Sequence, residues 1–159
     1  GGDALYELSG YPAGAGAGFS RLHFTTFAYP DEWGFTSQKN NPPTFFANYA
    51  QDFDPLHQHK ASPYGYTRPT NDAILSYDAL NTLLTGCGRV LSTNKTHVVR
   101  EDLRQALAGI TGAQAIQGVS GRIAFDQNGD PIDKALVILV VSPQGYIQLE
   151  SLQGHFLLP

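Results

Sequence analysis

The chain has 159 residues, of which 42% are hydrophobic and 15% are charged, and these proportions are typical of a folded globular protein. Its net charge of -4 and its scattered Lys and Arg residues provide no basic surface, so we expect neither nucleic acid nor an anionic membrane as a partner. The longest apolar run, residues 135–141, is much shorter than the ~18 residues of a spanning helix, and the single Cys87 excludes an intrachain disulfide and a Cys-based metal site.

The first half of the chain predicts a strand and a helix between long loops. Residues 4–8 have helical character, which Pro12 interrupts. Residues 21–29 alternate apolar and polar side chains, as a half-buried strand does. Residues 44–53 are predicted to be helical because their aromatic side chains recur at helical spacing, with Thr44 as the cap; the aromatic residues are Phe45, Phe46, Tyr49 and Phe53.

Two amphipathic helices are predicted in the second half. The first covers residues 70–84, has a wide apolar face and is expected to end at Gly86. The second covers residues 99–110 and repeats the same pattern up to Gly112.

Strands and turns are predicted after these helices. Residues 116–125 alternate as one strand, and residues 126–130 have the composition of a turn. Residues 135–141 are apolar on both faces and are therefore expected to form a central strand. Residues 146–149 are expected to pair with this strand as a hairpin.

Two groups of residues suggest a metal site. His57 and His59 form a His-x-His pair near Asp52 and Asp54, but zinc needs further ligands and a second shell, so a polar loop is the preferred interpretation. The segment 126–130 places three oxygen ligands at alternate positions, as a calcium loop does. It lacks the Gly and Glu that complete an EF-hand, so a hairpin turn is preferred there too. We expect no metal and no cofactor.

No motif for nucleophilic catalysis is present. Ser120 lies in Gly118-Val119-Ser120-Gly121, which does not have the spacing of a hydrolase elbow. Nothing near Cys87 in the sequence would lower the pKa of its thiol. We therefore expect that the chain is not an enzyme.

Aromatic residues suggest a different kind of site. Tyr64 and Tyr66 lie in a loop rich in Pro and Gly, and aromatic side chains of this kind often line small-molecule sites. A binding role and an ordinary loop role are both open for these two tyrosines. The Phe residues of segment 44–53 are interpreted as core because they follow the helical period.

The second half of the chain resembles the carboxy-terminal part of the type I periplasmic binding proteins, the branched-chain amino acid receptor family. The resemblance rests on Tyr77-Asp78-Ala79 in a helix, followed by Gly118-Val119-x-Gly121-x-Ile123-x-Phe125-Asp126-x-x-Gly129-Asp130. It extends from Gly1 to about Leu149. In that family, two Rossmann-like α/β lobes are joined by three crossovers, and the ligand binds in the cleft between them.

The resemblance implies an α/β fold: a partial Rossmann-like lobe, with a mixed sheet, flanking helices and a C-terminal β-hairpin. About four helices and four or five strands are expected. Residues 1–150 would form this single partial lobe with its crossover segments, and residues 151–159 a C-terminal tail. Missing strand partners would leave an exposed sheet edge, through which a homodimer is expected to form.

The implied function is recognition of a small polar solute outside the cytoplasm, in the periplasm or at the cell surface. The solute would be an amino acid or related amide, and the chain would act in an ABC importer, with its permease as partner, or as a truncated relative. One alternative is a ligand-sensing or protein-interaction module of a signalling protein, fused to a signalling domain. Another is a metal-dependent enzyme that uses the histidine loop.

The resemblance also implies the ligand residues. Gly1-Gly2-Asp3 matches the turn at which many members place an acidic residue against the ligand's ammonium, so Asp3 and the adjacent Ala4 are candidates. Tyr64 and Tyr66 join them as candidates because of their aromatic loop, and not because of the resemblance. A carboxylate at a helix start stays charged and can pair with a cation, although the same residue can serve as an ordinary helix cap. The family residues that hold the ligand carboxylate lie upstream of this match.

Overall fold

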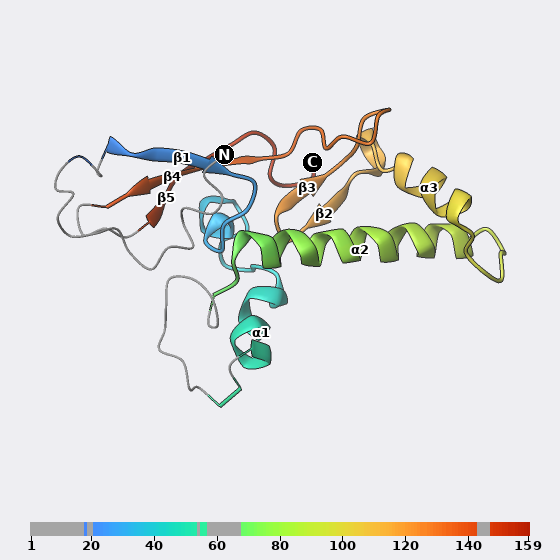
Figure 1. Cartoon of the computed structure of the whole chain (residues 1–159), viewed down its shortest axis with the longest axis horizontal. Coiled ribbons are helices and arrows are strands. Elements are labelled where there is room, and N and C mark those ends of the chain that lie inside the picture. The colour runs from blue at the N-terminus through green and yellow to red at the C-terminus, as the bar shows by residue number, and fades with distance from the viewer. Residues whose placement is uncertain (1–17, 19–20, 54, 57–67, 143–146) are drawn as a thin grey trace. The chain divides into compact units, whose positions relative to one another are not determined.

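The structure is a computed structural model that describes residue 18 and residues 21–53, 55–56, 68–142 and 147–159 (Figure 1). In these residues the chain is a mixed α/β protein with three α-helices and two antiparallel sheets, which confirms the predicted α/β class. The chain divides into two compact units, Gly1–Ile74 with Leu136–Gln153, and Leu75–Ala135 with Gly154–Pro159. We call these unit 1 and unit 2.

Unit 1 contains a three-stranded sheet in the order β1-β4-β5. Its strands are β1 (His23–Thr26), β4 (Leu136–Val141) and β5 (Ile147–Gln153), and both pairings are antiparallel. The strand predicted at residues 21–29, the central strand at 135–141 and its hairpin are thereby confirmed. The predicted boundary at residue 150 falls inside β5.

The expected mixed sheet does not form among the described strands. Parallel neighbours need a crossover connection that returns the chain to the same end of the sheet. Here β4 and β5 are consecutive strands of a hairpin, and β1 pairs with β4 from Phe24 opposite Leu139 to Thr26 opposite Val137. Both neighbouring pairs of strands, β1 with β4 and β4 with β5, are therefore antiparallel.

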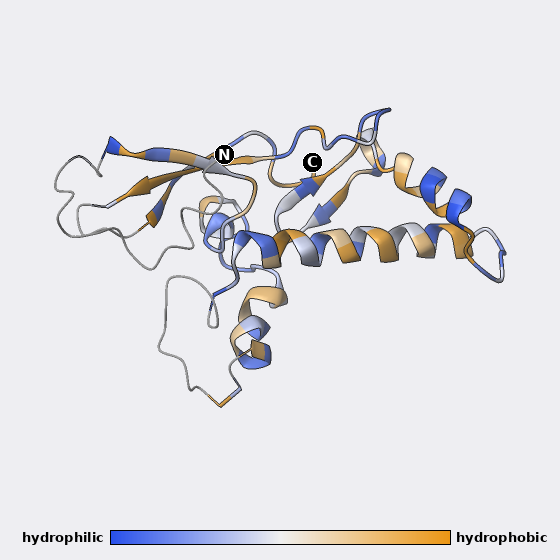
Figure 2. Cartoon of the chain, viewed as in Figure 1, coloured by the Kyte–Doolittle hydropathy of each residue, from blue (hydrophilic) through white to orange (hydrophobic). Residues whose placement is uncertain are grey.

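The core of unit 1 lies against β4. Every second β4 residue is buried, and β4 is hydrophobic over most of its length (Figure 2). The buried cluster comprises Phe24, Tyr29, Val137, Leu139, Val141 and Ile147. Each fully buried aliphatic side chain of this kind contributes roughly 1.5–3 kcal/mol relative to an exposed one.

The first helix, α1 (Thr44–Phe53), confirms the predicted helix at these residues. Its aromatic rings contact one another, and the Tyr49 and Phe53 rings stack with centroids 4.5 Å apart. Only Tyr49 is buried, and burial raises the pKa of its hydroxyl. Phe45 and Phe46 are only half-buried and Phe53 is exposed, so the core interpretation of these Phe residues is wrong for Phe53 and is not met in full by the other two.

Unit 2 is built around two helices, α2 (Asn71–Leu91), which begins in unit 1, and α3 (Arg100–Ala108). The sequence predicted that the helix beginning near residue 70 ends at Gly86. This prediction is wrong, because α2 continues to Leu91. A Cβ at position 86 would lie 2.8 Å from Leu103 Cδ1 and 2.9 Å from Leu107 Cδ2. Gly86 therefore lets the leucines of α3 approach α2 and does not terminate the helix.

The single strand predicted at residues 116–125 is also wrong. The segment forms a hairpin of β2 (Ile116–Gly118) and β3 (Gly121–Ile123), and Gly118 pairs with Gly121. The chain reverses at Val119 and Ser120, and Gly121 has φ +90°, a conformation that glycine adopts without steric cost. The alternating pattern cannot distinguish one strand from two short strands joined by such a turn.

The turn predicted at residues 126–130 is confirmed. Phe125 and Pro131 form an isolated antiparallel bridge, and Gly129 has φ +87° between them. Two 3-10 helices complete the described elements, Glu32–Phe35 in unit 1 and Gly112–Gln114 in unit 2. No helix in the described part of the chain combines the length and the hydropathy that crossing a bilayer requires.

The packing of α2 on α3 yields a prediction with a matched control. Gly88→Ala should raise the free energy of unfolding by about 0.5–1 kcal/mol, because alanine is the better helix residue and a Cβ there meets nothing within 4 Å. Gly86→Ala should give a lower stability than Gly88→Ala by about 1–3 kcal/mol, because its methyl group overpacks against Leu103 and Leu107. Urea denaturation of both variants measures the difference, and equal stabilisation would contradict the proposed role of Gly86.

Candidate functional site

The ligand residues predicted from the sequence lie outside the described residues. This holds for Asp3 and Ala4 and for Tyr64 and Tyr66, and their roles stay predictions. His57 and His59 of the proposed metal loop also lie outside them. Within the described ranges, no group of three or more His, Cys, Asp or Glu side chains is placed to hold a metal ion.

The two most specific pieces of the sequence motif meet inside unit 2. Asp78 of α2 is buried, with 4% of its surface exposed. Its Oδ1 accepts a hydrogen bond from the Val119 amide at 2.8 Å, and its Oδ2 accepts one from the Ser120 amide at 2.8 Å. The Ser120 hydroxyl also donates to Oδ2. One carboxylate therefore holds both residues of the β2–β3 turn.

A lysine completes this buried cluster. Lys134 donates from Nζ to the Ser120 carbonyl oxygen at 2.6 Å and to Ser120 Oγ at 2.5 Å. Ser120 is 1% exposed, so its hydroxyl accepts from Lys134 and donates to Asp78 away from water. Burying a carboxylate is costly unless it is hydrogen-bonded and close to positive charge, and this arrangement supplies both. We call Asp78, Val119, Ser120 and Lys134 the turn clamp.

Gly118, the last residue of β2, explains why the motif has a glycine next to the residues that Asp78 holds. A Cβ at Gly118 would collide with both carboxylate oxygens and the Cγ of Asp78. Gly118 therefore brings the β2–β3 turn close enough for its amides to reach Asp78. This contact gives the spacing of Tyr77-Asp78-Ala79 and Gly118-Val119-x-Gly121 a physical basis.

The C-terminal tail is anchored to the same hairpin. Gln117 donates from Nε2 to the Phe156 carbonyl oxygen at 3.1 Å and accepts from the Leu158 amide at 2.8 Å. Phe156 is buried, and its ring occupies the space where Gly121 would carry a Cβ. The tail has no sequence period, so its attachment gave no signal in the sequence.

A cavity of about 710 Å³ lies in unit 2 beside the turn clamp. Its volume is in the range of small-molecule sites. The wall is mainly apolar, with contributions from α2, α3 and residues 123–132; the apolar residues are Leu75, Ala79, Leu83, Leu107, Ala108, Ile123, Ala124, Phe125, Pro131 and Ile132. Asp78, Ser120 and Lys134 reach its polar part, where the clamp already uses their hydrogen-bonding groups. Arg104, Arg122 and Asp126 also line the cavity, so its mainly apolar wall carries charged groups as well.

The turn at residues 126–130 forms one end of the cavity wall and is held by its own first residue. The Asp126 carboxylate accepts hydrogen bonds from the Asp130 amide at 2.9 Å and the Asn128 amide at 2.8 Å. The bond from the Asp130 amide is the main reason that the pKa of Asp126 lies below its ordinary value. A carboxylate oxygen that accepts hydrogen bonds from two main-chain amides is typical of a turn. A turn is also the interpretation that the sequence favoured over a calcium loop.

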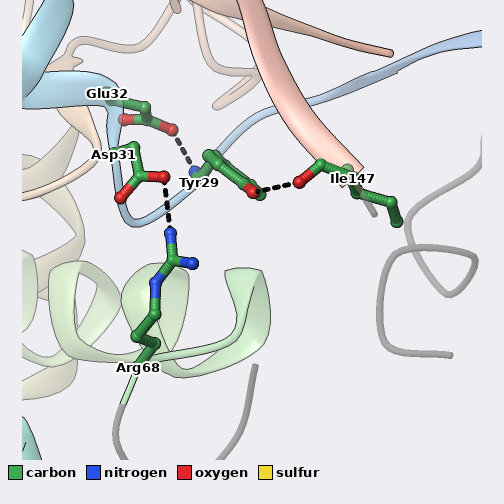
Figure 3. Close-up of polar contacts among 5 residues, drawn as sticks. All are labelled: Tyr29, Asp31, Glu32, Arg68 and Ile147. Carbon is green, nitrogen blue, oxygen red and sulfur yellow. Dashed lines mark hydrogen bonds and ion pairs between the residues drawn. The ribbon is translucent and has the colours of Figure 1, made fainter. Parts of the chain in front are cut away.

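A second polar cluster lies in unit 1 (Figure 3). The buried Tyr29 donates its hydroxyl to the Ile147 carbonyl oxygen at 3.1 Å, and its amide donates to the Glu32 carboxylate. The Arg68 guanidinium lies 5.8 Å from the centroid of the Tyr29 ring and pairs with Asp31 at 2.5 Å. These contacts connect the segment that follows β1 to Ile147 of β5 and to Arg68.

Comparison with known proteins assigns no family to the chain. No protein-family model matches the sequence, and no curated protein matches it. The residues quoted for the sequence resemblance, and the contacts these residues make in unit 2, are therefore the basis for any functional assignment.

The turn clamp predicts a strong dependence of stability on the Asp78 carboxylate. Asp78→Asn should lower the free energy of unfolding by about 2–4 kcal/mol, because the amide group cannot accept at both positions from Val119 and Ser120. The matched control is Asp72→Asn, an exposed carboxylate in the first turn of α2, which should cost only about 0.3–1 kcal/mol. Chemical denaturation measures both, and similar small losses would show that the clamp contributes little.

The ion pair between Glu101 and Arg104 on α3 predicts an unusually low titration midpoint for the Glu101 carboxyl. Arg104 lines the cavity and hydrogen-bonds Glu101, and this bond lowers the Glu101 pKa to about 2. A carboxyl with a depressed folded pKa stabilises the fold above its unfolded pKa, and this contribution is lost as the pH falls toward about 2. NMR titration of the Glu101 carboxyl should show the low midpoint, and Arg104→Gln should return it toward 4.5. An unchanged midpoint in the variant would contradict this cause.

Proposed function

We propose that the chain recognises a small polar solute outside the cytoplasm, as the carboxy-terminal part of a type I periplasmic binding protein or as its truncated relative. The proposed solute is an amino acid or a related amide. The proposed partners are an ABC permease, to which the solute is delivered, or a fused signalling domain.

The turn clamp is the observation that carries this proposal. The resemblance rests on two motif pieces that are separated by about forty residues, and in the fold they form a single hydrogen-bonded unit through Asp78, Val119 and Ser120. Chance similarity at two separate places would not require the residues to contact one another. The contact therefore supports an interpretation in which both pieces belong to one family-specific structure.

The organisation of the chain gives further support. The boundary between the two compact units is crossed after Ile74, after Ala135 and after Gln153. A chain that passes repeatedly between two compact units is in keeping with a protein that contains crossover segments. We propose that the α/β fold is a partial lobe of that type, and this part of the proposal comes from the sequence resemblance, because the described sheets are antiparallel.

The proposed contacts of Asp3 and Ala4 come from the resemblance, and those of Tyr64 and Tyr66 come from their aromatic side chains in a loop rich in Pro and Gly. Asp3 would pair with the ammonium group of the solute, with Ala4 beside it, and Tyr64 and Tyr66 would contact the remainder of the molecule. A charge-assisted hydrogen bond from an ammonium to a carboxylate is about twice as strong as one between neutral groups. Asp3 is therefore the residue whose removal should affect binding most.

A protein-interaction module is the second candidate function, and one observation favours it. Several large apolar side chains of α2 are exposed, namely Tyr77, Leu80, Leu83, Leu84 and Leu91. Gatherings of exposed apolar residues mark interaction surfaces more often than scattered single ones do. Solute recognition remains the leading proposal because the turn clamp supports the family resemblance as a whole.

Thermal unfolding with a panel of amino acids and small amides tests the leading proposal. A solute present at 100 times its dissociation constant should add about 2.7 kcal/mol, which corresponds to a rise in melting temperature of about 5–10 °C. Asp3→Asn should abolish this rise because the ammonium loses its ionic partner. Asp52→Asn, at an exposed position of α1, is the control and should leave the rise unchanged.

The outcomes separate the two candidates. A solute-specific rise that disappears only in Asp3→Asn supports recognition through this residue. An equal rise in Asp3→Asn assigns binding to another site. The absence of a rise with every solute contradicts ligand binding by this chain and leaves protein interaction as the function to pursue.

A further inference from the structure

Helix α2 presents two faces. One face is turned into unit 2: Asp78, Thr82, Gly86 and Val90 are buried, and Leu75, Ala79 and Leu83 line the cavity together with Asp78 and Thr82. The other face carries Tyr77, Leu80, Leu84 and Leu91, which are 41%, 56%, 58% and 46% exposed, and the half-buried Cys87 lies between the last two.

The exposed face has the spacing of a coiled-coil seam. Starting from Ala73, the apolar residues recur after four, three, four, three and four positions, at Tyr77, Leu80, Leu84, Cys87 and Leu91. This is the a/d pattern of a heptad repeat, which keeps one narrow stripe facing a partner helix along its whole length. We call these six residues the α2 stripe. Its regular spacing indicates a helix as the partner.

We propose that the α2 stripe is the interface of a homodimer in which the α2 helices of two copies pack antiparallel. In antiparallel coiled coils, each a position faces a d position of the other helix, and the register that centres the stripe on itself pairs Leu80 with Leu84 of the second copy. This arrangement is isologous, so it closes at two copies.

The same register matches side chains by size. It places Tyr77 opposite Cys87 of the second copy, and Leu91 opposite Ala73. A large side chain thus meets a small one in the outer layers, and two leucines meet in each central layer. A parallel arrangement would instead place Tyr77 against Tyr77 and Ala73 against Ala73, which overfills one layer and underfills another.

Charge distribution also fits a second copy. The charged residues of α2 are Asp72, Asp78 and Arg89, and none belongs to the stripe. Asp78 is held in the turn clamp and Arg89 donates to the Gln114 carbonyl oxygen at 2.9 Å. The antiparallel register therefore brings no like charges together. A single basic residue on the helix also disfavours an anionic membrane surface, which attracts helices rich in Lys and Arg.

The size of the stripe sets the strength of the dimer. It extends over about 27 Å of helix, and with a helix diameter of about 10 Å it covers roughly 270 Å² of projected face per copy. Stable complexes bury about 800 Å² per partner. We therefore expect a reversible dimer whose population rises with concentration.

Sedimentation velocity over a concentration series, with reductant present, tests the proposal. The full chain should shift from monomer to dimer, and Leu80→Glu or Leu84→Glu should weaken dimerisation by about tenfold or more, because each places a charge in a central layer. Leu56→Glu is the matched control, since Leu56 is 73% exposed and lies outside the stripe. Unchanged circular dichroism and melting temperature establish that the variants fold.

Cysteine cross-linking in a Cys87→Ser background tests the register. Leu80→Cys and Leu84→Cys chains should form disulfides with each other when mixed, because the two positions face one another in the antiparallel dimer. Preferential disulfides within each separate variant would establish a parallel pairing and overturn the proposed register.

The remaining outcomes overturn the interface itself. A chain that stays monomeric at every concentration has no such dimer. A dimer that persists in both Leu80→Glu and Leu84→Glu uses another surface. If that dimer is lost in Thr25→Lys, which adds a charge to the outer strand β1, the sheet edge is the interface instead.

Discussion

The Asp78 carboxylate is the interaction on which the rest of unit 2 depends. It links the longest helix to the β2–β3 turn, and that turn positions Gln117 and Gly121, which hold the C-terminal tail. A buried charge of this kind specifies one arrangement, because any other packing of α2 on the hairpin would leave the carboxylate without its amide donors. Lys134 contributes from the segment before β4, so three separate parts of the chain converge on one oxygen-rich position.

Local patterns in the sequence were sufficient to predict several of the elements but not where the elements contact one another. The alternation at residues 21–29, the aromatic spacing at 44–53 and the apolar run at 135–141 each determine a structure through their own residues. Gly86 was misinterpreted because a glycine that ends a helix and a glycine that admits a neighbouring leucine look alike without the neighbour. The hairpin at 116–123 was missed for the same reason, since Asp78 lies about forty residues earlier.

For the candidate site, too, the sequence identified residues but not the contacts between them. Asp78, Gly118 and Ser120 were all present in the recognised motif, yet their mutual contact could not be predicted, because hydrogen bonds between distant segments leave no periodic signal. Asp78, an acidic residue within an apolar helical pattern, is the one clue to these contacts in the sequence. If its carboxylate is buried, it requires hydrogen-bond donors from another part of the chain. Lys134 carried no distinguishing pattern at all. The cavity depends on three elements together and could only emerge from their packing.

The pairing of β1 with β4 has a consequence for how the chain is made. His23 lies opposite Val140, so the two strands are separated by more than one hundred residues. Closing so long a loop has an entropic cost, and sheets built from distant strands form slowly. During synthesis at ~5–20 residues per second, β1 emerges several seconds before its neighbour exists. For that interval its Phe24 has no sheet to pack against, whereas residues 75–135 of unit 2 can assemble around α2 before β5 and the C-terminal tail have been translated.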